Sequence, residues 1–140
     1  MMKREDFMRE AIRDAKRNKH HFGAVVVKGG RIISRAGKRL VGDPRYHAET
    51  QAIIKATDKL KTRNLRGCIL YSTCEPCLMC FYMAWITNVS EIFFGANLKD
   101  SKKYGFKEID IGVKELNKKA GNKIKIFSNL LRNECLELFK

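Results

Sequence analysis

The sequence predicts an α/β fold in which helices cover both faces of a mixed β-sheet, as a three-layer α-β-α sandwich. Three observations predict it: an amphipathic helical pattern near the amino terminus, two β-branched runs around a two-glycine turn, and an alternation of strand and helix through the second half. The chain has 140 residues, 44% of them hydrophobic, which is enough to fill one core. Because no repeat, linker or low-complexity tract interrupts it, we expect a single domain over residues 1–140.

The elements of the first half follow from their periodicity. Residues 3–19 carry apolar side chains at three- and four-residue spacing, which predicts an amphipathic helix. Residues 23–28 and 31–34 are β-branched runs on either side of Gly29 and Gly30, which predicts a hairpin. A helical stretch is then predicted from about Ala48 to Leu60, with its apolar residues on one face.

The second half alternates between strand and helix. Pro76 is tolerated in the first turn of a helix, and it therefore marks a helix start after a short buried strand. The expected elements are strands at 68–71, 91–94 and 124–127, and helices over the apolar run 77–86, over 112–120 and over 129–139.

The charge balance is strongly basic, with 29 basic and 15 acidic residues and a net charge of +14. This charge would attract anionic partners such as RNA or phosphorylated substrates, or it is spread over solvated faces without a dedicated partner. The amino terminus lacks the apolar stretch of a signal peptide, and the run 77–86 is about half of the roughly 20 residues that cross a bilayer. We therefore expect a cytoplasmic protein with no membrane partner.

The five cysteines predict metal binding rather than disulfides. An odd number does not suit a disulfide framework, and Cys74, Cys77 and Cys80 are too closely spaced for a natural set of bridges. Cys68 and Cys135 lie within apolar segments, where a thiol behaves as a small hydrophobic group.

The residues that carry chemistry stand at two predicted helix starts, His47-Ala48-Glu49 and Pro76-Cys77-Leu78-Met79-Cys80. Two thiolates and an imidazole are ligands that zinc accepts, and cysteines three apart share one face of a helix. Three protein ligands leave the fourth position to water, and zinc lowers the pKa of that water from 15.7 to about 7. Glu49 is the candidate proton shuttle, provided that it and His47 straddle the helix start.

These motifs resemble the cytidine deaminase superfamily, in the branch that contains tRNA adenosine deaminases and bacterial guanine deaminases. The resemblance also includes the Phe22-Gly23-Ala24-Val25-Val26-Val27 and Asp43-Pro44 segments. It implies a five-stranded sheet between helices, one Zn²⁺ per chain on His47, Cys77 and Cys80, and Glu49 as the proton shuttle. It also implies a homodimer.

The segment from Asp100 to Phe106 is similar to the guanine deaminase branch. Asp100 matches a carboxylate that accepts hydrogen bonds from N1 and the amino group of guanine, which favours a guanine-type purine base or nucleoside as substrate. An equally weighted alternative makes Asp100 a helix cap. Phe22 would stack on the base or pack in the core. Lys38 replaces the asparagine that the family places after Gly37, where it would meet a phosphate or only water.

Further departures from the family pattern are Phe81, Tyr82 and Ile86, which fall where relatives contact substrate. Taken by residue type alone, Phe81, Tyr82 and Trp85 are expected in the core. His20 and His21 follow a basic helix and are expected to be solvated.

Several alternatives remain open at this level. The reaction could be adenosine-to-inosine conversion in tRNA, or deamination of cytosine or another aminated heterocycle. Cys74 could join the other three ligands in a closed structural zinc site. The chain could also be a catalytically silent zinc-binding module that contacts RNA through its charge.

Overall fold

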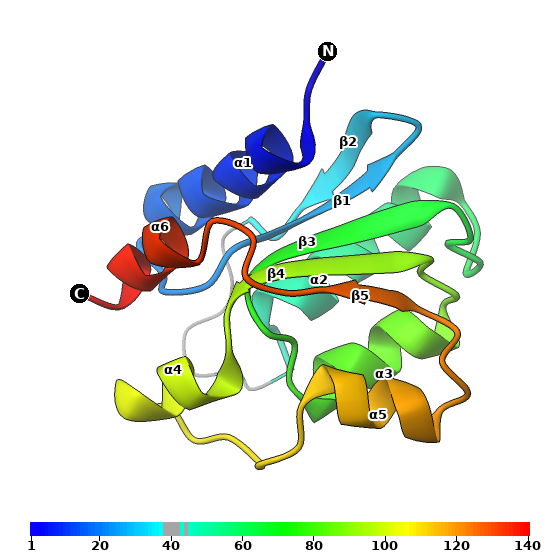
Figure 1. Ribbon diagram of the computed structural model, residues 1–140. Coiled ribbons are helices and arrows are strands. Elements are labelled where there is room, and N and C mark those ends of the chain that lie inside the picture. Colours follow the sequence, from blue (N-terminus) through cyan, green and yellow to red (C-terminus); the bar gives the residue numbers. More distant parts are fainter. Residues whose placement is uncertain (38–42, 44) are drawn as a thin grey trace.

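In a computed structural model that describes residues 1–37, 43 and 45–140, a five-stranded sheet lies between two layers of helices (Figure 1). The strand order is β2-β1-β3-β4-β5. β1 pairs antiparallel with β2 and β3, and the pairs β3/β4 and β4/β5 are parallel, so the sheet is mixed as predicted. The strands are β1 (Ala24–Lys28), β2 (Arg31–Arg35), β3 (Cys68–Cys74), β4 (Glu91–Ala96) and β5 (Lys125–Phe127).

The helices divide between the two faces of the sheet, as Figure 1 shows. α1 and α6 lie side by side on one face, and α2, α3 and α5 cover the other. The helices are α1 (Arg4–Arg17), α2 (Ala48–Leu60), α3 (Leu78–Ile86), α4 (Leu98–Lys103), α5 (Val113–Lys119) and α6 (Arg132–Leu136), followed by the 3₁₀ turn η1 (Glu137–Phe139). The fold predicted from the sequence, a three-layer α-β-α sandwich, is confirmed.

Strand β1 shows why the sheet needs helices on both sides. Its side chains alternate between the faces, so Ala24 and Val26 join the core under α2 and α3, while Val25 and Val27 join the core under α1 and α6. All four are at most 2% exposed. A strand that is apolar on both faces is stable only when both faces are covered.

The parallel pair β3/β4 sets the position of the site. The two strands end together, with Cys74 paired to Ala96, and each strand is followed by a helix that begins at the same edge of the sheet. Ligand sites in α/β sheets form outside the carboxyl ends of the strands. The start of α2 lies against this edge as well, since His47 and Cys77 are in contact there.

Two expectations about helices need correction. The predicted helix over 129–139 begins only at Arg132, because Asn129 and Leu131 have left-handed backbone angles, with φ of 63° and 51°, which interrupt a helix. Pro76 precedes the N-cap residue Cys77 instead of lying in the first turn of α3.

Within the described residues, no helix is both long and apolar enough to cross a bilayer.

Candidate metal centre and active site

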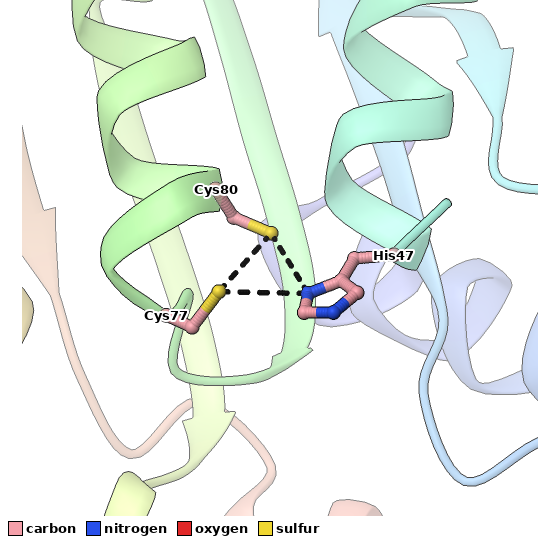
Figure 2. A group of neighbouring side chains, drawn as sticks. All are labelled: His47, Cys77 and Cys80. Carbon is pink, nitrogen blue, oxygen red and sulfur yellow. Dashed lines mark hydrogen bonds between the residues drawn. The ribbon is translucent and has the colours of Figure 1, made fainter. Parts of the chain in front are cut away.

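One imidazole and two thiols converge between the starts of α2 and α3 (Figure 2). The Nδ1 atom of His47 lies 3.5 Å from the Sγ atom of Cys77 and 3.4 Å from that of Cys80, and the two sulfurs are 3.6 Å apart. In a tetrahedral zinc site, bonds of about 2.3 Å to sulfur and about 2.0 Å to nitrogen separate two sulfurs by about 3.8 Å and a sulfur from a nitrogen by about 3.5 Å. The three side chains therefore fit a zinc ion.

Helix starts hold these ligands in place. His47 is the N-cap residue of α2 and Cys77 that of α3, and both have extended backbone angles. Cys80 is the third residue of α3, so a spacing of three brings its sulfur beside that of the cap. Glu49 is the second residue of α2, so it and His47 straddle the helix start, as a shared site requires.

The thiols are electrostatically prepared for a cation. A hydrogen bond from the Cys80 thiol lowers the pKa of Cys77 to about 4, against the opposing effect of burial and with the help of the His47 ring. Donation to Cys77 and burial raise the pKa of Cys80. One thiolate is thus favoured without a metal, and binding of a divalent cation would release the proton of the second.

A cavity of about 160 Å³ opens beside the metal ligands. It is lined by Phe22, Glu49, Cys74, Glu75, Phe106 and Glu108, together with His47, Ala48, Cys77 and Lys107. Glu49 is 6% exposed, and burial, followed by the charge of Cys77, raises its pKa to about 7. A carboxyl group in that range can both accept and donate a proton at neutral pH.

Glu108 is the residue that the sequence did not reveal. It lies in the segment between α4 and α5 and lines the cavity near Glu49. Burial raises its pKa, and the Ser101 hydroxyl donates a hydrogen bond of 2.6 Å to it. The available signal was an acidic residue directly after the Gly105-Phe106-Lys107 run, but Asp100 and Asp110 also lie close to it in the sequence.

Asp100 is not brought to the cavity lining. It is the third residue of α4, where its side chain accepts from the Asn97 amide while the Asn97 side chain accepts from the Asp100 amide. The carboxylate is also held by Arg132 of α6. The capping alternative therefore describes its contacts, and its role in substrate binding stays a prediction. Lys38 lies outside the described residues.

The aromatic predictions divide. Phe22 lines the cavity and also packs edge-on against Phe106, with ring centroids 4.9 Å apart, and its stacking on a base stays a prediction. Phe81 is buried, as expected. The core prediction is wrong for Tyr82, which is 56% exposed, because it projects from the outer side of α3. Ile86 is likewise 52% exposed and does not line the cavity.

Three other predictions concern side chains near the site. Cys74 lines the cavity, but its thiol donates to the Asn97 carbonyl at 3.7 Å, and burial raises its pKa far above the usual value. Among the described residues it does not belong to the metal-binding group. His21 is exposed, yet its Nδ1 atom lies 2.8 Å from the Leu138 carbonyl oxygen. His20 is half-buried.

A histidine and two cysteines at two helix starts, with a buried carboxyl group beside them on a three-layer α/β fold, define the class of zinc-dependent deaminases. The family model described as the cytidine and deoxycytidylate deaminase zinc-binding region matches residues 1–96. The chain belongs to this family. Its cofactor is zinc, and its chemistry is hydrolytic deamination.

Relatives of two kinds are similar to the chain. A tRNA-specific adenosine deaminase of Aquifex aeolicus is 41% identical over 101 residues, covering 68% of this chain and 67% of that protein. A guanine deaminase of Bacillus subtilis is 36% identical over 121 residues, covering 85% of this chain and 77% of the relative. The structure of a guanine deaminase from Nitrosomonas europaea superposes with a TM-score of 0.89 over 99% of this chain and 84% of the other, at 24% identity, which confirms the fold.

Proposed function

We propose that the protein deaminates a guanine-type purine, and that Glu108, instead of Asp100, binds the hydrogen-bond donors of the base. The observation that carries the proposal is the Glu108 carboxylate, which lines the cavity beside the metal ligands and Glu49. Guanine presents two adjacent donors, N1–H and the amino group, and a carboxylate accepts from both. The ring of adenine presents a bare acceptor at N1, which a carboxylate does not satisfy.

The cavity size supports a base as the substrate. Its volume of about 160 Å³ is below the roughly 300–1,000 Å³ of pockets that take drug-sized ligands, so a single ring system suits it better than a whole nucleotide. Phe22 and Phe106 supply apolar walls for a flat ring. Their edge-on packing against each other holds those walls in place.

The chain's own residues would divide the work of the reaction. When bound to His47, Cys77 and Cys80, zinc would supply a hydroxide nucleophile at neutral pH by lowering the pKa of water. Glu49 would take one proton from that water and pass it to the ring nitrogen next to the carbon under attack. It would then take the proton of the hydroxyl group formed on that carbon and pass it to the amine, which leaves as ammonia when its bond to the carbon breaks. Glu108 would hold the base so that its amino-bearing carbon faces the metal ligands.

Ammonia release tests this proposal. Zinc-loaded protein is assayed with guanine, guanosine, adenine, adenosine, cytosine, the corresponding nucleotides and tRNA, with Glu49→Ala as the blank. We expect release from guanine or guanosine that depends on Glu49. A Glu108→Gln variant should raise the KM for guanine, since one acceptor becomes a donor. Release from tRNA alone would overturn the guanine proposal.

A second candidate is the conversion of adenosine to inosine in tRNA. The net charge of +14 would bind phosphates, and the Aquifex aeolicus relative carries that activity in its name. tRNA binding that weakens steeply with salt, together with inosine formation, would support it over guanine deamination.

We also propose a homodimer built on the outer face of α2 and α3. Five apolar side chains there are between 39% and 56% exposed: Ile54, Leu78, Met79, Tyr82 and Ile86. A hollow that includes Ile54 and Ile86 lies between the two helices. A second copy would cover this face through a symmetric contact, in which the same patch serves both chains.

We propose the cytoplasm as the compartment of this protein, because its five free cysteines fit a reducing environment.

A further inference from the structure

The carboxylate of Glu75 connects three parts of the site. Glu75 stands between Cys74, the last residue of β3, and the turn that leads to the metal ligand Cys77. Its Oε1 atom accepts from the Leu98 amide at 3.2 Å, and its Oε2 atom accepts from the Val113 amide at 2.8 Å. One side chain therefore joins the metal-binding turn to two other segments.

Both amides are the first of a helix. Leu98 begins α4 and Val113 begins α5, and such amides have no partner within their own helix. The backbone has made room for the carboxylate, because a Cβ atom at Gly112 would lie only 2.8 Å from Oε2 of Glu75. The two helix starts and Gly112 together bind this side chain closely.

The segment between these two helices carries the substrate side of the cavity. Residues 104–112 include Phe106 and Glu108, which line the cavity together with the metal ligands His47 and Cys77. The Ile111 amide donates to the Ile109 carbonyl within the segment, and the Phe106 amide donates to the Ser101 carbonyl, which joins the segment to α4. Ser101 of α4 donates to Glu108, so the position of α4 is transmitted to that carboxylate.

We propose that Glu75 is a positioning residue that fixes the distance between the metal ligands and Glu108, whose carboxylate binds the substrate. This rests on the proposed role of Glu108. By binding the first amide of α4 and the first amide of α5 from the turn that also holds Cys77, Glu75 fixes the two helices that flank the 104–112 segment relative to the metal ligands. Both of its carboxylate oxygens accept from backbone amides, so the part that we assign to it is to hold the backbone in position.

A Glu75→Gln variant tests the proposal, because glutamine keeps one acceptor and presents an N–H group to the other amide. We expect about a tenfold rise in KM for guanine with zinc still bound at one ion per chain. The matched control is Glu115→Gln, which removes an exposed carboxylate from the first turn of α5 and should change nothing.

A double-mutant comparison separates positioning from simple loss of stability. If Glu75 acts through Glu108, adding Glu75→Gln to the Glu108→Gln variant should raise KM little further, whereas independent effects would multiply. A full tenfold effect in that background, or loss of zinc from Glu75→Gln, would overturn the proposal.

Hydrogen exchange provides a readout that does not depend on the substrate. In zinc-loaded Glu75→Gln, the amides of Leu98, Val113 and residues 106–108 should exchange faster than in the unmodified protein, while those of β3 should not. Unchanged exchange at these amides would overturn the proposed positioning role of Glu75. If the unmodified protein releases no ammonia from guanine, the proposed substrate fails while this measurement still decides the role of Glu75.

Discussion

The Asp100 carboxylate is bound at both oxygens by the Arg132 guanidinium, with Nη2 2.6 Å from Oδ1 and Nε 3.1 Å from Oδ2. Oδ2 also accepts from the Asn97 amide at 2.9 Å. The pair joins α4 to α6 across 32 residues of sequence. A carboxylate with these contacts has a structural function that explains its presence without a substrate.

This arrangement predicts a pH-dependent stability. Burial raises the pKa of Asp100, but hydrogen bonds from Arg132 and Asn97 outweigh it and leave the pKa below 3.8. The stabilisation is therefore present above the unfolded pKa and is lost as the pH falls through the folded pKa. Asp100→Asn should lower the free energy of unfolding by about 1 kcal/mol at pH 7, discounted for the exposure of Arg132.

The measurement for Asp100 is urea unfolding at pH 7 and at pH 3, together with guanine turnover. The difference between variant and parent should shrink at pH 3, and turnover should stay near that of the parent. Asp110→Asn, at an exposed position, is the control. If Asp100→Asn abolishes turnover at unchanged stability, Asp100 binds the substrate after all.

The metal centre predicts a clear difference between cysteines. Cys77→Ser and Cys80→Ser should each lose most bound zinc, because a hydroxyl is a poor replacement for a thiolate ligand. Cys74→Ser should keep one zinc per chain, since its sulfur donates to a carbonyl and lies outside the ligand group. Zinc content after gel filtration measures this. Zinc loss from Cys74→Ser would indicate a closed site with three cysteines.

Glu49 provides the test of proton transfer. Glu49→Gln keeps the size of the side chain but cannot carry the proton, so kcat should fall by about 10²–10⁴ while zinc content stays the same. Asp58→Asn removes an exposed carboxylate from the same helix and is the control. A Glu49→Gln variant with full activity would remove Glu49 from the mechanism.

The exposed apolar face predicts an oligomeric state. Light scattering on the parent should give the mass of a dimer, and Tyr82→Lys combined with Ile86→Lys should give a monomer of 16.1 kDa, since two charges would be buried at the contact. Ile109→Lys, at a residue 67% exposed elsewhere on the molecule, should leave the dimer intact. A parent that is monomeric at all concentrations would contradict the proposed interface.

Gly23 lies where α1 packs closely against the start of β1, so a larger residue there should lower the stability of the fold. A Cβ atom there would overlap the Ala11 carbonyl oxygen and crowd the Ala15 side chain. Gly23→Ala should therefore lower the free energy of unfolding by about 1–3 kcal/mol, through overpacking. Thermal unfolding measures this loss, and an unchanged melting temperature would show that α1 can shift at no cost.

Local patterns were sufficient for most of the fold. The α2 boundaries follow from apolar spacing, which lies within the helix itself. The same holds for the hairpin, where Gly29 and Gly30 both have positive φ angles. The helix after β5 was misplaced because the left-handed angles of Asn129 and Leu131 depend on how the chain turns over the sheet, which periodicity does not record.

The sequence by itself determined the metal site, because Cys77 and Cys80 are held three residues apart by one helix start and His47 and Glu49 flank another. Tertiary structure alone decided which carboxylate completes the cavity. Asp100 and Glu108 are eight positions apart in the sequence, and no periodicity ranks them. Arg132, 32 residues from Asp100, binds the first, while Ser101 donates to the second, which lines the cavity with the metal ligands. Contacts that distant leave no trace in local spacing, since they arise only when the elements pack together.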